Sequence, residues 1–375
     1  MPYIPNRFGE GYGLSVTGID NLLKKYPDTK LIITVDNGIV AYSAIKYAKT
    51  LGIDVIVTDH HVEGEEKLLC DALIHTTKIC GAAVAYMFAL ALDGKTSIDS
   101  EEHLDLVALA TISDLVPLIG ASRTFVKFGL EVLSRTQRVG LQALFNLAGI
   151  KQIGVYEIGH VIGPRLNASG RLASAMDSLR LICTKDFNKS QVLAKKLDST
   201  NKDRQLMTQE FALIAKDECE KDLNTKISFV AHADFNEGVI GLVASRMVEL
   251  YYKPSFVVSI GETVSKGSAR SISGVNIIEM IRSVSTHVVQ SGGHPMAAGF
   301  TVKTSQIKKL KKALEDQAKI VVEDSHLERR LNIDMQLSFL DITLELYKKI
   351  KMLSPFGMKN PEPVFLSRGV TIEEV

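Results

Sequence analysis

Two stretches of sequence decide the fold: LIITVDNG at residues 31–38 and DVIVTDHH at residues 54–61. Each contains an apolar run rich in β-branched residues, of the length of a buried strand, and ends in polar residues. Residues 41–51 between them carry apolar residues at helical spacing, which predicts a β-α-β unit. Because a right-handed crossover places the ends of neighbouring parallel strands at one edge of a sheet, the polar residues should converge there. The pattern predicts a divalent-metal site at that edge.

Composition narrows the class of protein. The chain has 375 residues, of which 46% are hydrophobic, so we expect two or three domains with substantial cores. A net charge of +1 gives no overall basic field, so any nucleic-acid contact must come from local patches. The four cysteines show no CxxC spacing, which favours reduced thiols in the cytoplasm. We find no signal peptide and no apolar run long enough to span a membrane.

The order of strand and helix patterns divides the chain into four parts. Residues 1–185 alternate the two patterns, which is typical of a doubly wound parallel sheet. Residues 186–223 lack glycine and proline and predict a connector of one or two long helices. Residues 224–325 predict a second, smaller α/β domain, with a glycine-rich turn at residues 292–294. Residues 326–375 look like the incomplete start of a strand-rich module.

Three separated places supply candidate metal ligands. Asp36 ends the first strand and could bridge two ions, and His60 adds a ring nitrogen after the second strand. Asp59 could orient a ligand from behind, and Asp114 closes an apolar segment before Leu-Val-Pro. Asp-Asn-Gly is also a common turn sequence, and an aspartate in the position of Asp114 is often a helix cap. The Asp-His-His triplet, which ends at His61, favours a metal site because polar groups after a buried strand need partners.

Small residues interleaved with cations predict places that hold phosphate. Residues 163–171 contain Arg165, Asn167 and Arg171 among turn-forming residues, and arginine forks match phosphate oxygens. The alternative is a polar interdomain loop with a helix cap.

The second domain repeats this pattern. Arg270 follows small residues, and Gly292, Gly293 and His294 form a second glycine-rich group. Residues 238–246 open a helix whose N-terminus favours anions. A tight turn with a structural histidine, and glycines that serve packing alone, are the alternatives.

These motifs, taken in order, resemble those of RecJ-type exonucleases of the DHH phosphoesterase superfamily. The resemblance runs from IPNRFGEGYG at residues 4–13, through SDLVPL at residues 113–118, to PFGMKNPEP at residues 355–363. It implies two α/β domains flanking a groove, joined by a long helix and followed by an OB-fold module. It also implies hydrolysis of single-stranded DNA from the 5′ end in repair and recombination, with two Mn²⁺ or Mg²⁺ ions. A single-strand-binding protein or a helicase is an implied partner.

The resemblance also assigns roles to residues. Asp36 would bridge the ions, and His60 and Asp114 would complete the second metal site. His61 would contact the scissile phosphate with support from Asp59 as the catalytic pair. From the facing domain, Arg270 and His294 would hold the phosphate chain, beside Gly292 and Gly293.

The chain departs from the family pattern at one decisive place. The family begins with a strand that ends in an Asp-x-Asp motif for the first metal, and this sequence contains no Asp-x-Asp. Residues 235–237 read Phe-Asn-Glu where the family tends to have a Trp-His-Pro-like sequence. We therefore expect a fragment with an incomplete first metal site, which binds manganese weakly and degrades DNA poorly or not at all.

Two other readings stay open. One is a phosphoesterase of the same superfamily that acts on short oligonucleotides or cyclic dinucleotides, which product lengths would reveal. The other is a non-catalytic nucleic-acid-binding relative, which would bind no manganese in a calorimetric titration.

Overall fold

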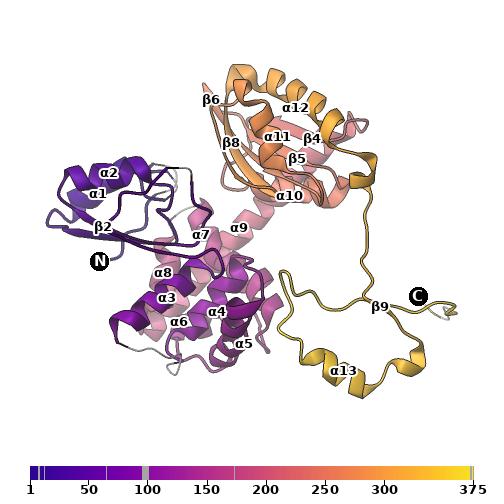
Figure 1. Ribbon diagram of the computed structural model, residues 1–375, viewed down its shortest axis with the longest axis horizontal. Helices are drawn as coiled ribbons and strands as arrows, with labels where there is room; N and C mark the ends of the chain where they lie inside the picture. The colour runs from indigo at the N-terminus through magenta and orange to yellow at the C-terminus, as the bar shows by residue number, and fades with distance from the viewer. Residues whose placement is uncertain are drawn as a thin grey trace. The chain divides into compact units, whose positions relative to one another are not determined.

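A computed structural model of the chain describes residues 1–6, 9–11, 13–64, 66–94, 101–172, 174–371 and 374. The chain forms two compact units (Figure 1). The first unit contains residues 1–199 and 333–375, and the second contains residues 200–332. Helix α9, Phe187–Glu220, crosses the boundary without interruption, which confirms the predicted long helix.

A parallel sheet organises the start of the first unit. Its strands, in spatial order, are β1 (Leu31–Val35), β2 (Asp54–Asp59) and β3 (Ala72–His75). Helices α1 (Val16–Lys25) and α2 (Tyr42–Thr50) lie on one side of these strands, and α3 (Gly81–Leu92) lies on the other (Figure 1). The predicted β-α-β unit is therefore confirmed, with Leu31 paired to Asp54 at the start of the register.

The two faces of β1 are in different surroundings. Ile32 packs with α1 and α2 in a buried cluster. Leu31, Ile33 and Val35 point to the other face and are 46%, 44% and 51% exposed. Within the described residues β1 is also the edge strand of its sheet. In the part of the chain that the structure describes, this apolar face of β1 is thus only half covered, and one backbone edge of β1 has no strand paired to it.

The strand–helix alternation predicted up to residue 185 ends at β3. The described residues between 76 and 183 form helices and their connections only. These helices after α3 are α4 (Leu104–Ser113), α5 (Gly120–Ser134), α6 (Val139–Leu147), the π-helix η1 (Glu157–Ile162), α7 (Gly163–Leu172) and α8 (Met176–Cys183). Continuous apolar runs such as residues 106–110 fit buried strands and buried helices equally well, which explains the difference. The loop predicted at residues 163–171 is likewise part of helix α7.

The second unit contains a five-stranded mixed sheet in the order β4-β5-β6-β8-β7. The strands are β4 (Ser228–His232), β5 (Ser255–Ser259), β6 (Val264–Arg270), β7 (Gln290–His294) and β8 (Ala297–Lys303). The helices are α10 (Ile240–Tyr251), α11 (Ile277–Ser283) and α12 (Ile307–Val321). The turn predicted at residues 292–294 is in fact the end of strand β7, where glycines are paired with β8.

The last part of the chain returns to the first unit. Residues 333–375 contain β9 (Met335–Gln336), α13 (Leu344–Lys351) and β10 (Phe365–Leu366), with β9 and β10 paired in parallel. Short 3₁₀ turns lie at Ser285–His287, Thr304–Gln306, Asp324–Leu327 and Phe339–Asp341. None of the described helices combines the length and the apolar character needed to cross a membrane.

Candidate metal centre

Asp36 stands at the carboxyl end of β1 in an uncommon backbone conformation. Its φ angle is +63°, in the left-handed region that aspartate tolerates better than most residues. Its backbone N–H donates to the Thr58 carbonyl at 3.0 Å, which ties it to β2. A Cβ added to Gly81 would lie 2.1 Å from Asp36 Oδ1, so the start of α3 leaves room for this carboxylate only because residue 81 is glycine.

His60 joins the carboxylates of Asp36 and Asp114. Its Nε2 lies 3.0 Å from Asp36 Oδ1 and 3.4 Å from Asp114 Oδ2, and its side chain is 13% exposed. Contact with Asp36 raises the pKa of His60. Yet no described group makes a hydrogen bond of good geometry with the buried Nε2 atom. A buried ring nitrogen that faces two carboxylates in this way fits a shared cation, so the residues suit a divalent metal.

Asp114 reaches the cluster from a different element. It caps the C-terminus of α4, and its backbone N–H donates to the Ala110 carbonyl at 2.9 Å. Burial against the surrounding chain raises the pKa of Asp114, although 48% of its side chain stays accessible. A bound cation would therefore stabilise the ionised form.

Asp59 and His61 form a second pair behind the cluster. The Asp59 side chain is 1% exposed and lies 2.7 Å from His61 Nδ1. It also accepts hydrogen bonds from the backbone N–H groups of Ile39, His60 and His61. Burial alone would raise the pKa of Asp59, but these hydrogen bonds together lower it to about 2. The bond to Asp59 in turn raises the pKa of His61, which favours its protonated form.

His75 supports the same loop, and the sequence analysis missed it. Its Nε2 lies 2.6 Å from the His61 carbonyl oxygen, and its Nδ1 lies 3.0 Å from Glu63 Oε1. It ends β3 opposite Asp59 in the register. Its place at the end of the third strand was the available signal, because all three strands end at one edge.

The predicted phosphate ligands of α7 fall into two groups. A cavity of about 660 Å³ in the first unit is lined by Asp36 and Asp114 and also by Asn167 and Arg171. Arg165 is not among its lining residues, since its Nε donates to Asp198 Oδ1 at 2.9 Å and its Nη1 to a backbone carbonyl. This placement does not support Arg165 as a phosphate ligand and gives it a role in packing α7 against α9.

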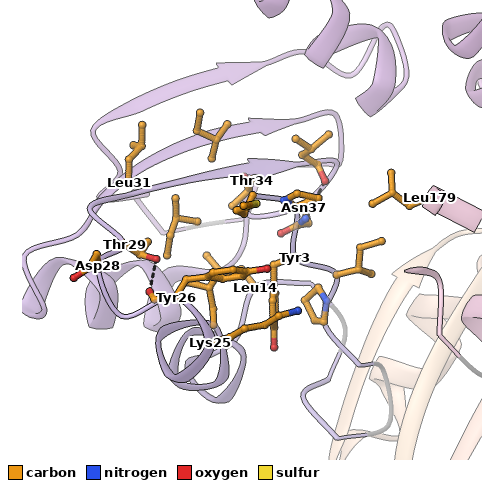
Figure 2. Close-up of a pocket in the computed structure, with 18 of the residues that line it drawn as sticks. Tyr3, Leu14, Lys25, Tyr26, Asp28, Thr29, Leu31, Thr34, Asn37 and Leu179 are labelled. Atoms are coloured by element: carbon orange, nitrogen blue, oxygen red, sulfur yellow. Dashed lines mark hydrogen bonds between the residues drawn. The ribbon is translucent and has the colours of Figure 1, made fainter. Parts of the chain in front are cut away.

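A larger hollow, of about 890 Å³, runs beside β1 (Figure 2). Leu31 and Ile33 of β1 line it, together with Tyr3, Leu14 and Tyr26. Its lining does not include the predicted metal ligands, although Val35 and Asn37 line both this hollow and the cavity at the strand ends.

In the second unit, strand register places Arg270 and His294 in one row of the sheet. Both are paired with Ala297, from opposite sides of β8, so their side chains leave the same face. Arg270 Nη1 donates to Ser268 Oγ at 3.2 Å and to the Ala269 carbonyl at 2.9 Å. A Cβ added to Gly241, in the first turn of α10, would lie 2.9 Å from Arg270 Nη2. The Arg270 guanidinium therefore lies next to the N-terminus of α10, an arrangement that favours binding of an anion.

The two glycines of β7, Gly292 and Gly293, have different surroundings. Gly292 pairs with Gly299, two rows along from the His294–Ala297 pair and on the same face, and a Cβ added to Gly292 would meet nothing within 4 Å. Gly293 has a φ of +146°, and a Cβ there would lie 2.4 Å from the Ala297 carbonyl oxygen. Gly292 thus exposes bare backbone, whereas Gly293 is required by the close approach of β8.

The fold and the Asp-His-His site define a protein of the DHH class. The family profile described as the DHH family N-terminal domain matches residues 1–111, the DHHA1 domain matches residues 223–320, and the RecJ OB domain matches residues 333–375. The chain belongs to the RecJ family of single-stranded-DNA-specific exonucleases, as its similarity to individual members shows.

Two relatives and one solved structure document this membership. The chain is 38% identical over 387 residues to RecJ of Bacillus subtilis, which covers 100% of this chain and 49% of the relative. It is 30% identical to RecJ of Escherichia coli, with 96% of this chain and 68% of the relative covered. The crystal structure of Thermus thermophilus RecJ with Mn²⁺ gives a TM-score of 0.82 at 29% identity, covering 93% of this chain and 53% of that one. The chain thus spans about half the length of two of these three proteins.

Proposed function

We propose that this chain is a metal-dependent phosphodiesterase that removes nucleotides from the 5′ end of single-stranded DNA. The observation that carries the proposal is the buried His60 Nε2, which has no well-formed hydrogen bond and lies 3.0 Å and 3.4 Å from the Asp36 and Asp114 carboxylates. The metal is Mn²⁺ or Mg²⁺, in keeping with the relatives whose structures hold these ions. A divalent cation there lowers the pKa of a bound water and stabilises the charge that develops during phosphodiester cleavage.

The chain's own residues bind and orient the substrate. Asp59 fixes the His61 ring through Nδ1, so that Nε2 is the nitrogen left to donate to a phosphate oxygen. The raised pKa of His61 keeps the proton on the ring for this contact.

Each unit, taken by itself, has donors that suit further phosphates of the strand. Asn167 and Arg171 line the same cavity as Asp36 and Asp114, where they can donate to phosphate oxygens. In the second unit we assign Arg270, His294 and the bare backbone of Gly292 to the phosphate chain. Contacts of this kind follow the backbone and read no sequence.

Replacing Asp36 tests the proposal. We expect calorimetry to show weak Mn²⁺ binding to the unmodified chain and 5′-labelled single-stranded DNA to be shortened slowly. The binding should be weak because the sequence contains no Asp-x-Asp to supply further carboxylates. Asp36→Ala should abolish both, since it removes a ligand.

Asp54→Ala is the matched control. Asp54 lies at the other end of β2, is 67% exposed and pairs with Lys49, so its loss should leave Mn²⁺ binding unchanged. Undetectable binding by the unmodified chain, or binding that survives Asp36→Ala, would contradict the proposal. A preference for cyclic dinucleotides or short oligonucleotides over long strands would instead support the alternative, a phosphoesterase of the same superfamily that acts on such short substrates.

The proposal extends to surroundings and partners. A nuclease for single-stranded DNA needs proteins that generate or hold such strands, so we propose a helicase or a single-strand-binding protein as partner and repair or recombination as the role. The cytoplasm, where bacterial DNA resides, is the proposed location. Co-purification with tagged candidates in the presence of nuclease-resistant DNA would test the partners.

A further inference from the structure

The middle of the C-terminal segment, residues 333–375, is anchored within the first unit, next to the turn that carries Asp114. Residues 352–360, here named the latch, follow α13 and contact the connection between α4 and α5. This contact groups residues 333–375 with the first unit and not with the second unit, which precedes them in sequence. The proposed function gives the latch no task.

Arg123 of α5 holds one end of the latch. Its Nη2 donates to the carbonyl oxygens of Met352, Leu353 and Ser354 at 3.3, 3.0 and 2.9 Å. These carbonyls follow the last turn of α13, where a guanidinium is favoured by the orientation of the peptide dipoles. The end of α13 is thus tied to α5.

The other end of the latch is bonded to Leu118, which is 2% exposed. The Leu118 N–H donates to the Met358 carbonyl at 2.7 Å. Gly357 packs so closely that an added Cβ would lie 2.7 Å from Leu118 Cδ1. Asn360 closes the latch by donating from Nδ2 to the carbonyls of Leu353 and Pro355. The latch therefore offers a preformed acceptor to one backbone amide of the α4–α5 connection.

The same connection holds a strained residue beside the metal ligand. Leu115, directly after Asp114, has a φ of +56°, and its side chain is 63% exposed. A residue with a Cβ keeps this left-handed conformation only where its surroundings impose it. The Val116 N–H bond to the Thr111 carbonyl restrains the turn from α4, and the Leu118 bond to Met358 restrains it from the latch.

We propose that the latch positions Asp114: by fixing Leu118, it keeps Leu115 in its strained conformation and the Asp114 carboxylate against His60. Arg123 and Gly357 are then positioning residues for the metal centre, although neither touches it. The inference rests on the proposed function for the metal, but the conformational part can be measured without it.

Arg123→Ala in the full chain tests the proposal with two measurements. Hydrogen exchange followed by mass spectrometry should show faster exchange over residues 111–119, because the latch is released. The dissociation constant for Mn²⁺, measured by calorimetry, should rise about three- to tenfold, which corresponds to roughly 0.7–1.4 kcal/mol. Arg123→Lys, which keeps the charge and one donor group, should give an intermediate result.

Arg329→Ala is the matched control. Arg329 Nη2 also bonds backbone carbonyls at the end of a helix, those of Glu249 and Leu250 in α10 of the second unit. Its loss should leave both the exchange over residues 111–119 and the Mn²⁺ affinity unchanged.

Leu115→Gly separates positioning from general weakening. Glycine adopts the left-handed conformation without strain, so Arg123→Ala with Leu115→Gly should recover most of the Mn²⁺ affinity while the Leu118 amide still exchanges fast. Unchanged Mn²⁺ affinity in Arg123→Ala despite fast exchange, or no recovery by Leu115→Gly, would overturn the proposal.

A chain that binds no Mn²⁺ at all would refute the metal centre instead. The proposal for the latch would then be tested by the hydrogen-exchange rates of the backbone amides of residues 115 and 116. Faster exchange there in Arg123→Ala, reversed by Leu115→Gly, supports the proposal, and its absence refutes it.

Discussion

The two sheets of this protein begin alike and end in different surroundings. Strands β1 and β2 pair in parallel across one helix, and so do β4 and β5. In the second unit Phe256, Val257 and Val258 of β5 are fully buried. In the first unit every second residue of β1 is exposed by 44–51%. Similar apolar runs therefore contribute very different amounts of burial.

The difference indicates that the two sheets contribute in different ways, the second through its buried interior and the first through the polar residues at its edge. In the second sheet, β5 is paired with β4 on one edge and with β6 on the other, and helices cover both faces. The interior of this sheet is therefore tightly packed and contributes to stability. The first sheet contributes mainly through its carboxyl edge, where β1 and β2 present Asp36 and Asp59. Beside β1 lies the hollow shown in Figure 2, so part of its apolar surface faces open space.

The largest expected effect is on the second sheet. Phe256→Ala removes a fully buried ring that packs between Phe229 and Phe300. We expect the free energy of unfolding of the second unit to fall by about 3–5 kcal/mol, from lost transfer energy and the cavity left behind. Urea unfolding followed by hydrogen exchange of β5 peptides measures it. A decrease of less than about 1 kcal/mol in the free energy of unfolding would show that the two sheets tolerate the loss of an apolar side chain equally well.

An intermediate effect is expected at the carboxyl edge of the first sheet. Asp59→Asn replaces a buried carboxylate that accepts hydrogen bonds from three backbone N–H groups and from His61. We expect a loss of about 2 kcal/mol in the free energy of unfolding of the first unit, because hydrogen bonds to a charged acceptor are lost. Exchange of β2 peptides in urea measures it.

The dependence on pH supplies the control for Asp59. Its folded pKa of about 2 lies below the ordinary value of 3.8, so the ionised group stabilises the fold above about pH 4. This contribution should disappear as the pH falls from about 4 to 2, and the difference between the original chain and Asp59→Asn should shrink over that range. A difference that stays constant down to pH 2 would contradict the role given to the charge.

The smallest effect is expected on β1. Ile33→Thr changes an exposed side chain that lines the hollow. We expect the free energy of unfolding to change by no more than about 0.5 kcal/mol and the solubility to rise, because little buried area is lost and an apolar face becomes polar. Urea unfolding and light scattering test this. A loss comparable to that of Phe256→Ala would mean that this face is covered in solution.

The sequence predicted much of the first sheet and its edge, and the reasons are local. Period, length and the polar ends of residues 31–38 and 54–61 are enough to define two parallel strands and to bring Asp36 near His60. The secondary structure after β3 was harder to predict from the sequence. Helices such as α4 are buried on most sides, so their apolar residues show no helical periodicity. The ion pair of Arg165 with Asp198 was not foreseen from the sequence, because the two residues lie 33 positions apart.

By itself, the sequence determined the parallel strand pair, the long helix and the placement of acidic and imidazole groups at strand ends, because these follow from side-chain spacing along one segment. Only the tertiary structure decided that β1 is the edge strand among the described residues, that His75 supports the His61 loop and that the latch anchors Leu118 beside Asp114. Such features depend on which distant segments meet, and spacing along the chain carries no information about those contacts.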